Sequence, residues 1–185
     1  MNDFNKSLLI IAKTAIKDKL NNTNEIKSLK TQMLLKYPIL NTPKATFVTL
    51  NLHNKLRGCI GSLIATRPFI DDLVSNAISA GFNDPRFNPI TSNEFINTEL
   101  EISILSEPKE IFYEDIVELQ NQIQIGVDGV ILKQSNHQAT FLPQVWEQLP
   151  KFDEFFQHLC HKARLDINCI YNHPQIFTYQ VEKIK

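Results

Sequence analysis

The chain has 185 residues, 43% of them hydrophobic and 21% charged, and its 19 basic and 20 acidic side chains leave a net charge of −1. That length is enough for one domain with its own hydrophobic core. The charge balance excludes a strong electrostatic attraction to extended nucleic acid or to an anionic membrane. The N-terminal stretch reads neither as a signal peptide nor as a membrane span, so we expect a cytoplasmic protein with no membrane association.

The predicted domain covers residues 1–185 and begins with a helix. Apolar residues at helical spacing predict an amphipathic N-terminal helix over residues 3–20. Residues 21–44 are polar and interrupted by two prolines, which predicts an irregular segment. The body of the domain then runs over residues 45–185.

The first half of the body alternates between apolar and polar residues, as strands do. This pattern predicts strands over residues 45–52 and 56–63, joined by a short turn into a hairpin. A helix over residues 68–81 follows, opened by a proline and ended by a glycine. A short helix with the capping box Thr91-x-x-Glu94 then precedes another strand, over residues 98–105.

The second half of the body mixes short strands with helices. A D-G turn at residues 127–129 predicts a hairpin between residues 123–126 and 130–133. Aromatic and aliphatic residues at helical spacing predict a helix over residues 152–163. Alternation over residues 176–182 predicts the last strand.

The strand over residues 56–63 reads Leu-Arg-Gly-Cys-Ile-Gly-Ser-Leu and holds two of the five glycines of the chain. A period of two places Arg57 and Cys59 on one face, beside backbone that Gly58 and Gly61 leave bare. A guanidinium beside bare backbone suits a carboxylate or phosphate group. A cation near a thiol also favours the thiolate, so Cys59 is a candidate nucleophile.

Simpler interpretations of this strand stay open. Cysteine is often buried as a small core residue, and Arg57 could cap a neighbouring helix. The two glycines could serve close helix packing alone. Leu56 and Ile60 form the apolar pair on the other face, which predicts that they pack inward while Cys59 faces a cleft.

The loop over residues 83–89 contains two prolines, which hold Asp84 and Arg86 in place at low entropic cost. The loop follows the helix that begins after the glycine-rich strand, so we expect Arg86 to return to the same end of that strand. An internal tie between Asp84 and Arg86 is the structural alternative.

The remaining cysteines and histidines point to no metal or cofactor. The three cysteines are widely spaced, which is not the pattern of a disulfide framework, and we expect reduced thiols. Cys160 falls on the core face of its helix and Cys169 has no evident partner. His158 and His161 lie three residues apart without a third ligand, so a surface role is favoured over a metal site.

Six stretches of this sequence together resemble the AMMECR domain family, known in prokaryotes as protein A of the AmmeMemoRadiSam system, from about residue 8 to about residue 183. The resemblance implies an α+β fold with antiparallel sheets packed against helices, in a larger lobe and a smaller lobe with a cleft between them. The six stretches are LRGCIGSL at 56–63, NDPRFNPIT at 83–91, ELEISILS at 99–106, IGVDGVIL at 125–132, TFLPQVW at 140–146 and FFQHLCHKA at 155–163.

The family's signature is LRGCIG, and it carries over residue by residue to Arg57, Gly58, Cys59 and Gly61 in the strand over residues 56–63. The resemblance also carries over to Arg86 and Phe87 in the loop, and to Pro143 and Gln144. The sequence departs from many relatives at Asn83, where they have histidine, and this departure weakens a cysteine–histidine dyad. A general base would then have to be His53, His137 or a histidine of a helix. The sequence does not distinguish among these candidates.

The family resemblance implies no established reaction, and it leaves open whether the chain is an enzyme. It implies association with Memo-type, extradiol-dioxygenase-like proteins and with radical SAM enzymes. Three hypotheses follow: binding of a small anionic ligand, thiol chemistry at Cys59, and a scaffold role without chemistry. The ligand-binding candidates are Arg57, Gly58, Gly61, Asp84, Arg86 and Gln144.

Overall fold

Two four-stranded sheets with antiparallel strand pairs, each with its own helices, make up the fold in the computed structural model, which describes residues 2–185. This arrangement confirms the predicted α+β class. The helices are α1 (Asp3–Asn21), α2 (Glu25–Lys36), α3 (Phe69–Phe82), α4 (Ser92–Ile96), α5 (Ile116–Gln122) and α6 (Phe152–Lys162), with 3-10 turns η1 (Pro38–Asn41), η2 (Pro143–Glu147) and η3 (Cys169–Asn172). The strands are β1 (Ala45–Leu52), β2 (Lys55–Gly61), β3 (Thr98–Leu105), β4 (Lys109–Ile111), β5 (Gly129–Gln134), β6 (His137–Phe141), β7 (Gln175–Tyr179) and β8 (Val181–Ile184).

The chain divides into two compact units. Unit 1 contains the residues up to Leu105 together with Glu182–Lys185, and unit 2 contains Ser106–Val181. None of the helices within residues 2–185 is long and apolar enough to cross a membrane. The cleft that the family resemblance implies stays a prediction.

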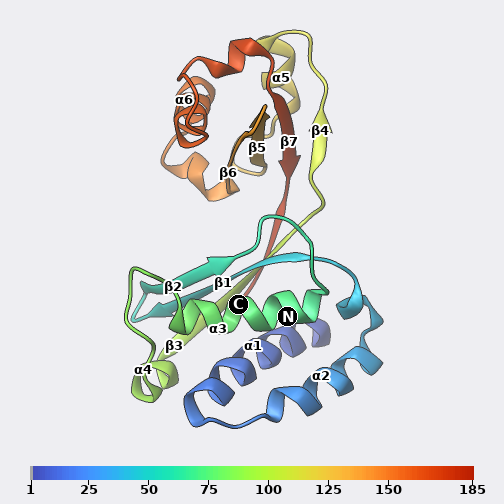
Figure 1. Ribbon diagram of the computed structural model, residues 1–185, viewed down its shortest axis with the longest axis vertical. Coiled ribbons are helices and arrows are strands. Elements are labelled where there is room, and N and C mark those ends of the chain that lie inside the picture. The colour runs from blue at the N-terminus through green and yellow to red at the C-terminus, as the bar shows by residue number, and fades with distance from the viewer. Residues whose placement is uncertain (1) are drawn as a thin grey trace. The chain divides into compact units, whose positions relative to one another are not determined.

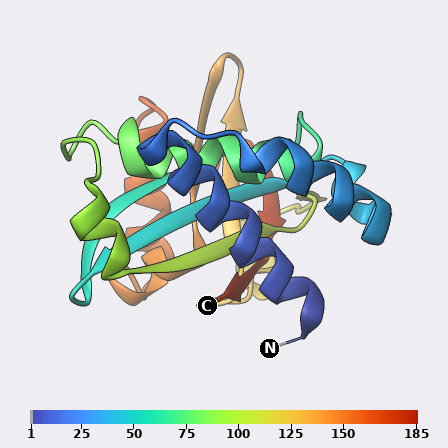
Figure 2. The same ribbon diagram turned by 90° about the horizontal axis from the view of Figure 1, so that it is seen from below.

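Unit 1 is built on the sheet with strand order β2-β1-β3-β8, and α1 and α3 cover one of its faces (Figures 1 and 2). Inward residues of β1 and β3 meet the apolar stripes of the two helices, as the sequence periodicity predicted. The buried residues at this contact include Leu8, Ile11, Val48, Leu50, Leu73, Ala77, Leu100 and Ile102.

The N-terminal region is partly as predicted. The predicted helix over residues 3–20 is confirmed by α1, but the prediction of an irregular segment over residues 21–44 is wrong, because α2 and η1 lie there. None of the residues of α2 is fully buried. Its few apolar side chains pack only partly against unit 1, so its hydrophobic pattern is too weak to be recognised as a helix.

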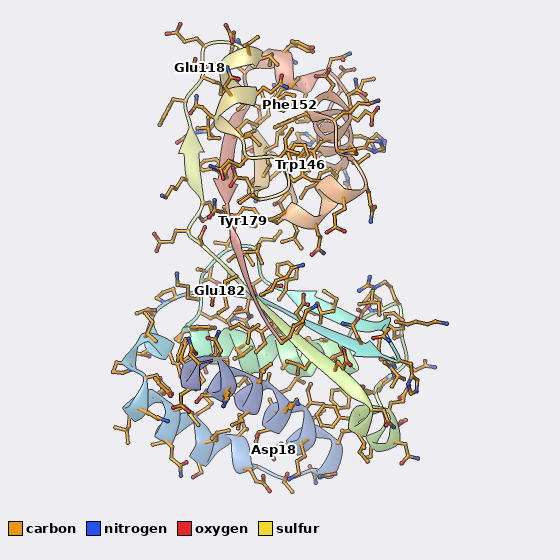
Figure 3. All side chains as sticks on the ribbon, turned by 180° about the vertical axis from the view of Figure 1, so that it is seen from behind. Asp18, Glu118, Trp146, Phe152, Tyr179 and Glu182 are labelled. Atoms are coloured by element: carbon orange, nitrogen blue, oxygen red, sulfur yellow. A yellow bond between two sulfur atoms is a disulfide. The ribbon has the colours of Figure 1, made fainter. Side chains whose placement is uncertain are left out.

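The turn between α1 and α2 is held by Asp18, which lies at the end of α1 (Figure 3). Its carboxylate accepts hydrogen bonds from the Thr23 hydroxyl at 2.6 Å and from the backbone N–H of Ile26 at 2.7 Å. Two donors on one buried carboxylate fix where α2 starts.

The β1–β2 hairpin is confirmed, but it contains a bulge that the sequence did not reveal. Leu50 pairs with Gly58 while Asn51 pairs with Leu56, so Arg57 is the extra residue on β2. A bulge shifts the alternation of side chains by one residue. The prediction that Leu56 packs inward is therefore wrong: it is 43% exposed, whereas Ile60 does pack against the core.

Unit 2 is built on the sheet with strand order β4-β7-β5-β6, with α5 and α6 as its helices. The predicted helix over residues 152–163 is confirmed by α6. The ring of Trp146 stacks on Phe155 with centroids 3.5 Å apart, and Phe152 belongs to the same aromatic cluster (Figure 3). This cluster fills the core of the unit.

The hairpin predicted around residues 127–129 is wrong in register. The hairpin forms between β5 and β6 instead, and Ser135 adopts the positive φ of 54° at its turn. Asp128 lies just before β5, where its carboxylate accepts the backbone N–H of Gln124 and its carbonyl accepts the indole N–H of Trp146. These bonds hold residues 124–128 as a loop.

The expectation of three reduced thiols is also wrong. Cys160 of α6 and Cys169 of η3 form a disulfide, with their Cα atoms 5.9 Å apart. Both side chains are buried, because the short connection after α6 returns the chain to the core face that holds Cys160. Disulfides are rare in the cytosol of most organisms, so the cytoplasmic expectation loses its cysteine-based support. Cys59 is the free cysteine.

Candidate functional site

The candidate site starts with Arg57, which the bulge in β2 releases from strand pairing. Its Nε donates to Glu94 Oε1 at 2.9 Å and its Nη2 to Glu94 Oε2 at 3.2 Å, so the guanidinium meets the carboxylate in a bidentate pair. Nη2 also donates to the carbonyl of Asn88 at 2.9 Å. The side chain is only 11% exposed. Bulges often re-aim a side chain near functional sites.

One nitrogen of Arg57 has no partner. Its Nη1 is buried, and no hydrogen-bond acceptor for it is found within residues 2–185. A buried donor left unsatisfied costs about 1–3 kcal/mol, and more when it is charged. Such a group in a folded protein indicates an additional partner or a functional role.

Asp84 joins the loop over residues 83–89 to β2. Its Oδ2 accepts the backbone N–H of Cys59 at 2.9 Å, and its two oxygens accept Arg86 Nη2 at 2.7 Å and Nε at 2.9 Å. β2 is an edge strand, so its outward N–H and C=O groups at Cys59 lack a neighbouring strand. The Asp84–Arg86 pair occupies this part of the edge, because Arg86 Nη2 also donates to the Cys59 carbonyl at 3.3 Å.

Phe87 brings the two arginines to one place. Its ring centroid lies 5.7 Å from the guanidinium carbon of Arg57 and 5.5 Å from that of Arg86. Arg86 is 53% exposed, so part of its guanidinium remains open to solvent. The internal tie between Asp84 and Arg86 is therefore present, and it leaves donor groups of Arg86 accessible.

Cys59 lies on the face of the sheet opposite α3, since the preceding Gly58 faces that helix. The thiol is half-buried and accepts a hydrogen bond from the Thr49 hydroxyl at 3.3 Å. Thr49 is the cross-strand partner of Cys59 in β1. Arg86 therefore lies against the backbone of Cys59, and Arg57 and Arg86 share the ring of Phe87.

The histidines offer no base for Cys59 inside unit 1. His53 is the one histidine of that unit, and it lies in the β1–β2 turn, four residues along β1 from Thr49. Four residues of strand span about 13 Å, which is beyond hydrogen-bonding reach. His137 lies in unit 2, where its Nδ1 contacts the carbonyl of Ala163 at 2.9 Å.

The two glycines of the signature serve packing. A Cβ on Gly58 would lie 2.0 Å from the carbonyl oxygen of Ala80 in α3, and one on Gly61 would lie 2.2 Å from the ring of Phe47. The space beside each glycine is therefore filled by protein. Gln144, the remaining predicted ligand residue, is an exposed residue of η2 in unit 2.

Two features near β2 were not identified from the sequence, the role of Glu94 and a network around Asp72. Glu94 was recognised only as the capping residue of α4, although it also pairs with Arg57. Asp72 of α3 is 1% exposed and accepts hydrogen bonds from Thr46, Ser62, Arg67 and Asn76. An aspartate in the first turn of a helix is already explained by the helix dipole, so nothing in the sequence marked it.

Within residues 2–185, no group of three or more His, Cys, Asp or Glu side chains is arranged to hold a metal ion. His158 and His161 lie beside Gln157 and Ile167 at a shallow concavity of α6. The donors that the candidate site leaves open belong to its two guanidinium groups, and guanidinium groups bind anions.

The ion pairs of the site change the pKa values of their carboxylates. Hydrogen bonds from Arg57 lower the pKa of Glu94 to about 2. The guanidinium of Arg86 lowers the pKa of Asp84. Both carboxylates are therefore charged throughout the physiological range, and each neutralises one arginine.

These shifts predict acid sensitivity with a definite sign. The unfolded chain binds more protons than the folded chain between about pH 2 and pH 4.5, so the free energy of unfolding is highest above that window and falls as the pH drops through it. Urea unfolding measured at about pH 5.5 and about pH 3 checks this expectation. In Glu94→Gln the loss of stability between the two pH values should be smaller, and an unchanged loss would contradict the assignment.

Proteins of several archaea are similar to this chain over most of its length. The family model described as AMMECR1 matches residues 9–184. A protein of Methanothermobacter thermautotrophicus is 32% identical over 185 residues, covering 97% of this chain and 92% of the relative, and one of Saccharolobus solfataricus is 35% identical over 179 residues, covering 90% and 74%. A crystal structure of an uncharacterized protein from Pyrococcus horikoshii superposes with a TM-score of 0.76 at 26% identity, covering 99% of this chain and 91% of that one.

Proposed function

The chain belongs to the AMMECR1 family, a family of uncharacterised proteins, so we propose its function from the site itself. It is a binding module that holds a small carboxylate or phosphate group at Arg57 and Arg86. The notion of an anionic ligand follows from the donors that the site leaves unused. Both arginines lie against Phe87, so their free N–H groups can serve one ligand.

The single observation that carries this proposal is the buried, unpartnered Nη1 of Arg57. Its other nitrogens are held by Glu94 and Asn88, so the guanidinium cannot turn to satisfy Nη1 without breaking those bonds. Because Nη1 is covered, a ligand oxygen reaches it only if the covering side chains shift. A carboxylate or phosphate oxygen would then supply the missing acceptor with a charge-assisted hydrogen bond.

The charges of the site limit the kind of anion. Glu94 and Asp84 already neutralise Arg57 and Arg86, so the four groups together carry no net charge. A ligand is then recognised by directed N–H donors and not by a positive field. This favours a compact oxyanion group on a small molecule over a polyanion.

A thiol-dependent enzyme that uses Cys59 as nucleophile is the second candidate. The Thr49 hydroxyl donates a hydrogen bond to the sulfur of Cys59, and Arg86 lies against the same residue. The candidate lacks a general base in unit 1. Cys59→Ser separates the two functions, because it would abolish thiol chemistry and leave anion binding in place.

Partner proteins form a further part of the proposal. The family resemblance supports association with Memo-type, extradiol-dioxygenase-like proteins and with radical SAM enzymes, and a scaffold role without chemistry would use the same surface. Co-purification with such proteins from the same organism tests this part. The absence of any complex at about micromolar concentrations would exclude a stable assembly.

We expect a ligand panel to identify the class of anion. Inorganic phosphate, pyrophosphate, citrate and glycerol 3-phosphate are added separately, and sodium chloride at matched ionic strength serves as the reference. A ligand at 100 times its Kd stabilises the fold by about 2.7 kcal/mol, which raises Tm by roughly 5 °C. At least one of these anions should give such a shift in thermal unfolding.

The variants Arg86→Gln and Lys55→Gln test whether the ligand-dependent rise in Tm comes from binding at the candidate site. Arg86→Gln should lose most of the ligand-dependent rise in Tm, measured against its own ligand-free Tm. Lys55 is an exposed cation on β2, the strand that contains Arg57, so Lys55→Gln should keep the ligand-dependent rise in Tm. Retention of the full rise in Arg86→Gln would place the anion elsewhere.

A further inference from the structure

A concavity in unit 1 lies between α1, α4 and the start of β3. It has a volume of about 450 Å³, which falls within the usual range of about 300–1,000 Å³ for small-molecule sites. Its wall contains no residue of the Arg57 site, so what it binds is a separate question from the function proposed above.

The floor of this cavity is apolar. Leu20 of α1 and Phe95 of α4 are both partly buried and pack against the core of unit 1. Ile96, the next residue of α4, lines the same cavity but is 79% exposed. A large exposed apolar side chain beside an apolar hollow marks surface that a ligand would remove from water.

The rim of the cavity is positively charged. Lys13 and Lys17 lie four residues apart on the exposed face of α1, and no carboxylate is among the residues that line the cavity. Lys17 has only a 3.7 Å contact with Glu25, and both side chains are more than half exposed. Such a pair is worth little, so the ammonium group of Lys17 remains able to bind another anion.

Lys13 is the second cation of the rim. It also borders a smaller concavity lined by Glu99 and Glu101, but Glu101 pairs with Lys183 and Lys185. Both lysines are therefore available to an anionic group at the cavity.

From this combination we propose that the cavity between α1, α4 and β3 binds a small monocarboxylate with an apolar aromatic or short alkyl body. The apolar body lies on Leu20, Phe95 and Ile96, and the carboxylate lies at the lysine rim. Each half of the cavity then contacts the half of the ligand that matches it chemically.

The experiment uses 1-naphthoate as the probe and its uncharged counterpart 1-naphthamide, titrated into the full chain and followed by amide NMR. We expect saturable shifts at the C-terminal half of α1 and at α4, with 1-naphthamide binding about tenfold more weakly because it lacks the charge. Lys17→Gln should weaken naphthoate binding about fivefold. Ile96→Ser should weaken it by a similar factor, since it removes exposed apolar contact without disturbing the core.

Lys19→Gln is the matched control, because Lys19 is an exposed cation of the same helix that does not line the cavity. Its affinity for 1-naphthoate should stay within about twofold of the wild type. Equal affinity for the acid and the amide, an equal effect of Lys19→Gln and Lys17→Gln, or shifts that map outside α1 and α4 would each overturn the proposal. So would the absence of saturable binding.

Discussion

Replacing Gly58 by alanine should destabilise unit 1 by at least about 3 kcal/mol. The new Cβ would lie 2.0 Å from the carbonyl oxygen of Ala80 and 3.1 Å from its carbonyl carbon. Both neighbours are backbone atoms of α3, so neither can rotate away. Either β2 or α3 has to move, and Ala80 of α3 belongs to the hydrophobic core of the unit. Urea unfolding followed by far-ultraviolet circular dichroism measures the loss.

Gly81→Ala is the matched control for this prediction. Gly81 belongs to α3, and its added Cβ would lie 3.2 Å from the Cγ2 atom of Ile90, a side chain that can shift. Alanine also gains about 0.5–1 kcal/mol over glycine in a helix. We therefore expect a net change below about 1 kcal/mol. Equal losses in Gly58→Ala and Gly81→Ala would mean that the close approach of β2 to α3 does not limit stability.

Asp72→Ala should cost about 3–5 kcal/mol, because it removes the acceptor at the centre of a buried network. Oδ2 of Asp72 accepts the backbone N–H of Thr46 at 2.9 Å, the Thr46 hydroxyl at 2.7 Å and the Asn76 amide at 2.8 Å. Oδ1 accepts the Ser62 hydroxyl at 2.7 Å and Arg67 Nη2 at 2.8 Å. Alanine would leave the buried donors of Thr46 and Asn76 without this acceptor.

The neighbouring residue provides the control for the network. Asp71 lies in the same first turn of α3, is 41% exposed and pairs with Lys30. Asp71→Ala removes the same charge from the same helix end, and we expect a loss below about 1 kcal/mol. The difference between the two variants in urea unfolding isolates the buried network from the helix dipole. Similar losses in both would contradict it.

Much of the fold could be predicted because its main elements have strong periodicity. The apolar stripes of α1, α3 and α6 and the alternation in β1 and β3 lead directly to the observed elements. α2 could not be recognised, because none of its residues is fully buried. The misplaced hairpin shows that a D-G pair is a turn signal only when its own side-chain bonds do not hold another loop.

Only part of the candidate site could be predicted: Arg57, Asp84 and Arg86 were named, whereas Glu94 was missed and Gln144 lies in unit 2. Strand parity and the two prolines of the loop were enough to predict that Arg86 lies close to Cys59. The bulge at Arg57 could not be predicted, because an extra residue leaves the local composition unchanged. Glu94 was hidden by its role as a helix cap, although its carboxylate serves Thr91 and Arg57 together. For the glycines, bare backbone beside a ligand and close packing both stayed open, and only the tertiary contacts show that protein atoms fill the space.

The most direct test of the central proposal observes the guanidinium groups themselves. NMR of the arginine side-chain N–H groups is recorded while inorganic phosphate, and separately acetate, is added at constant ionic strength. The proposal predicts saturable changes in the resonances of Arg57, which has the unpartnered Nη1, and of Arg86, which lies over the same Phe87 ring, with at least one of the two anions. Arg67, which is held in the Asp72 network, should remain unchanged. Small, linear changes shared by all arginines with both anions would contradict an anion site at Arg57.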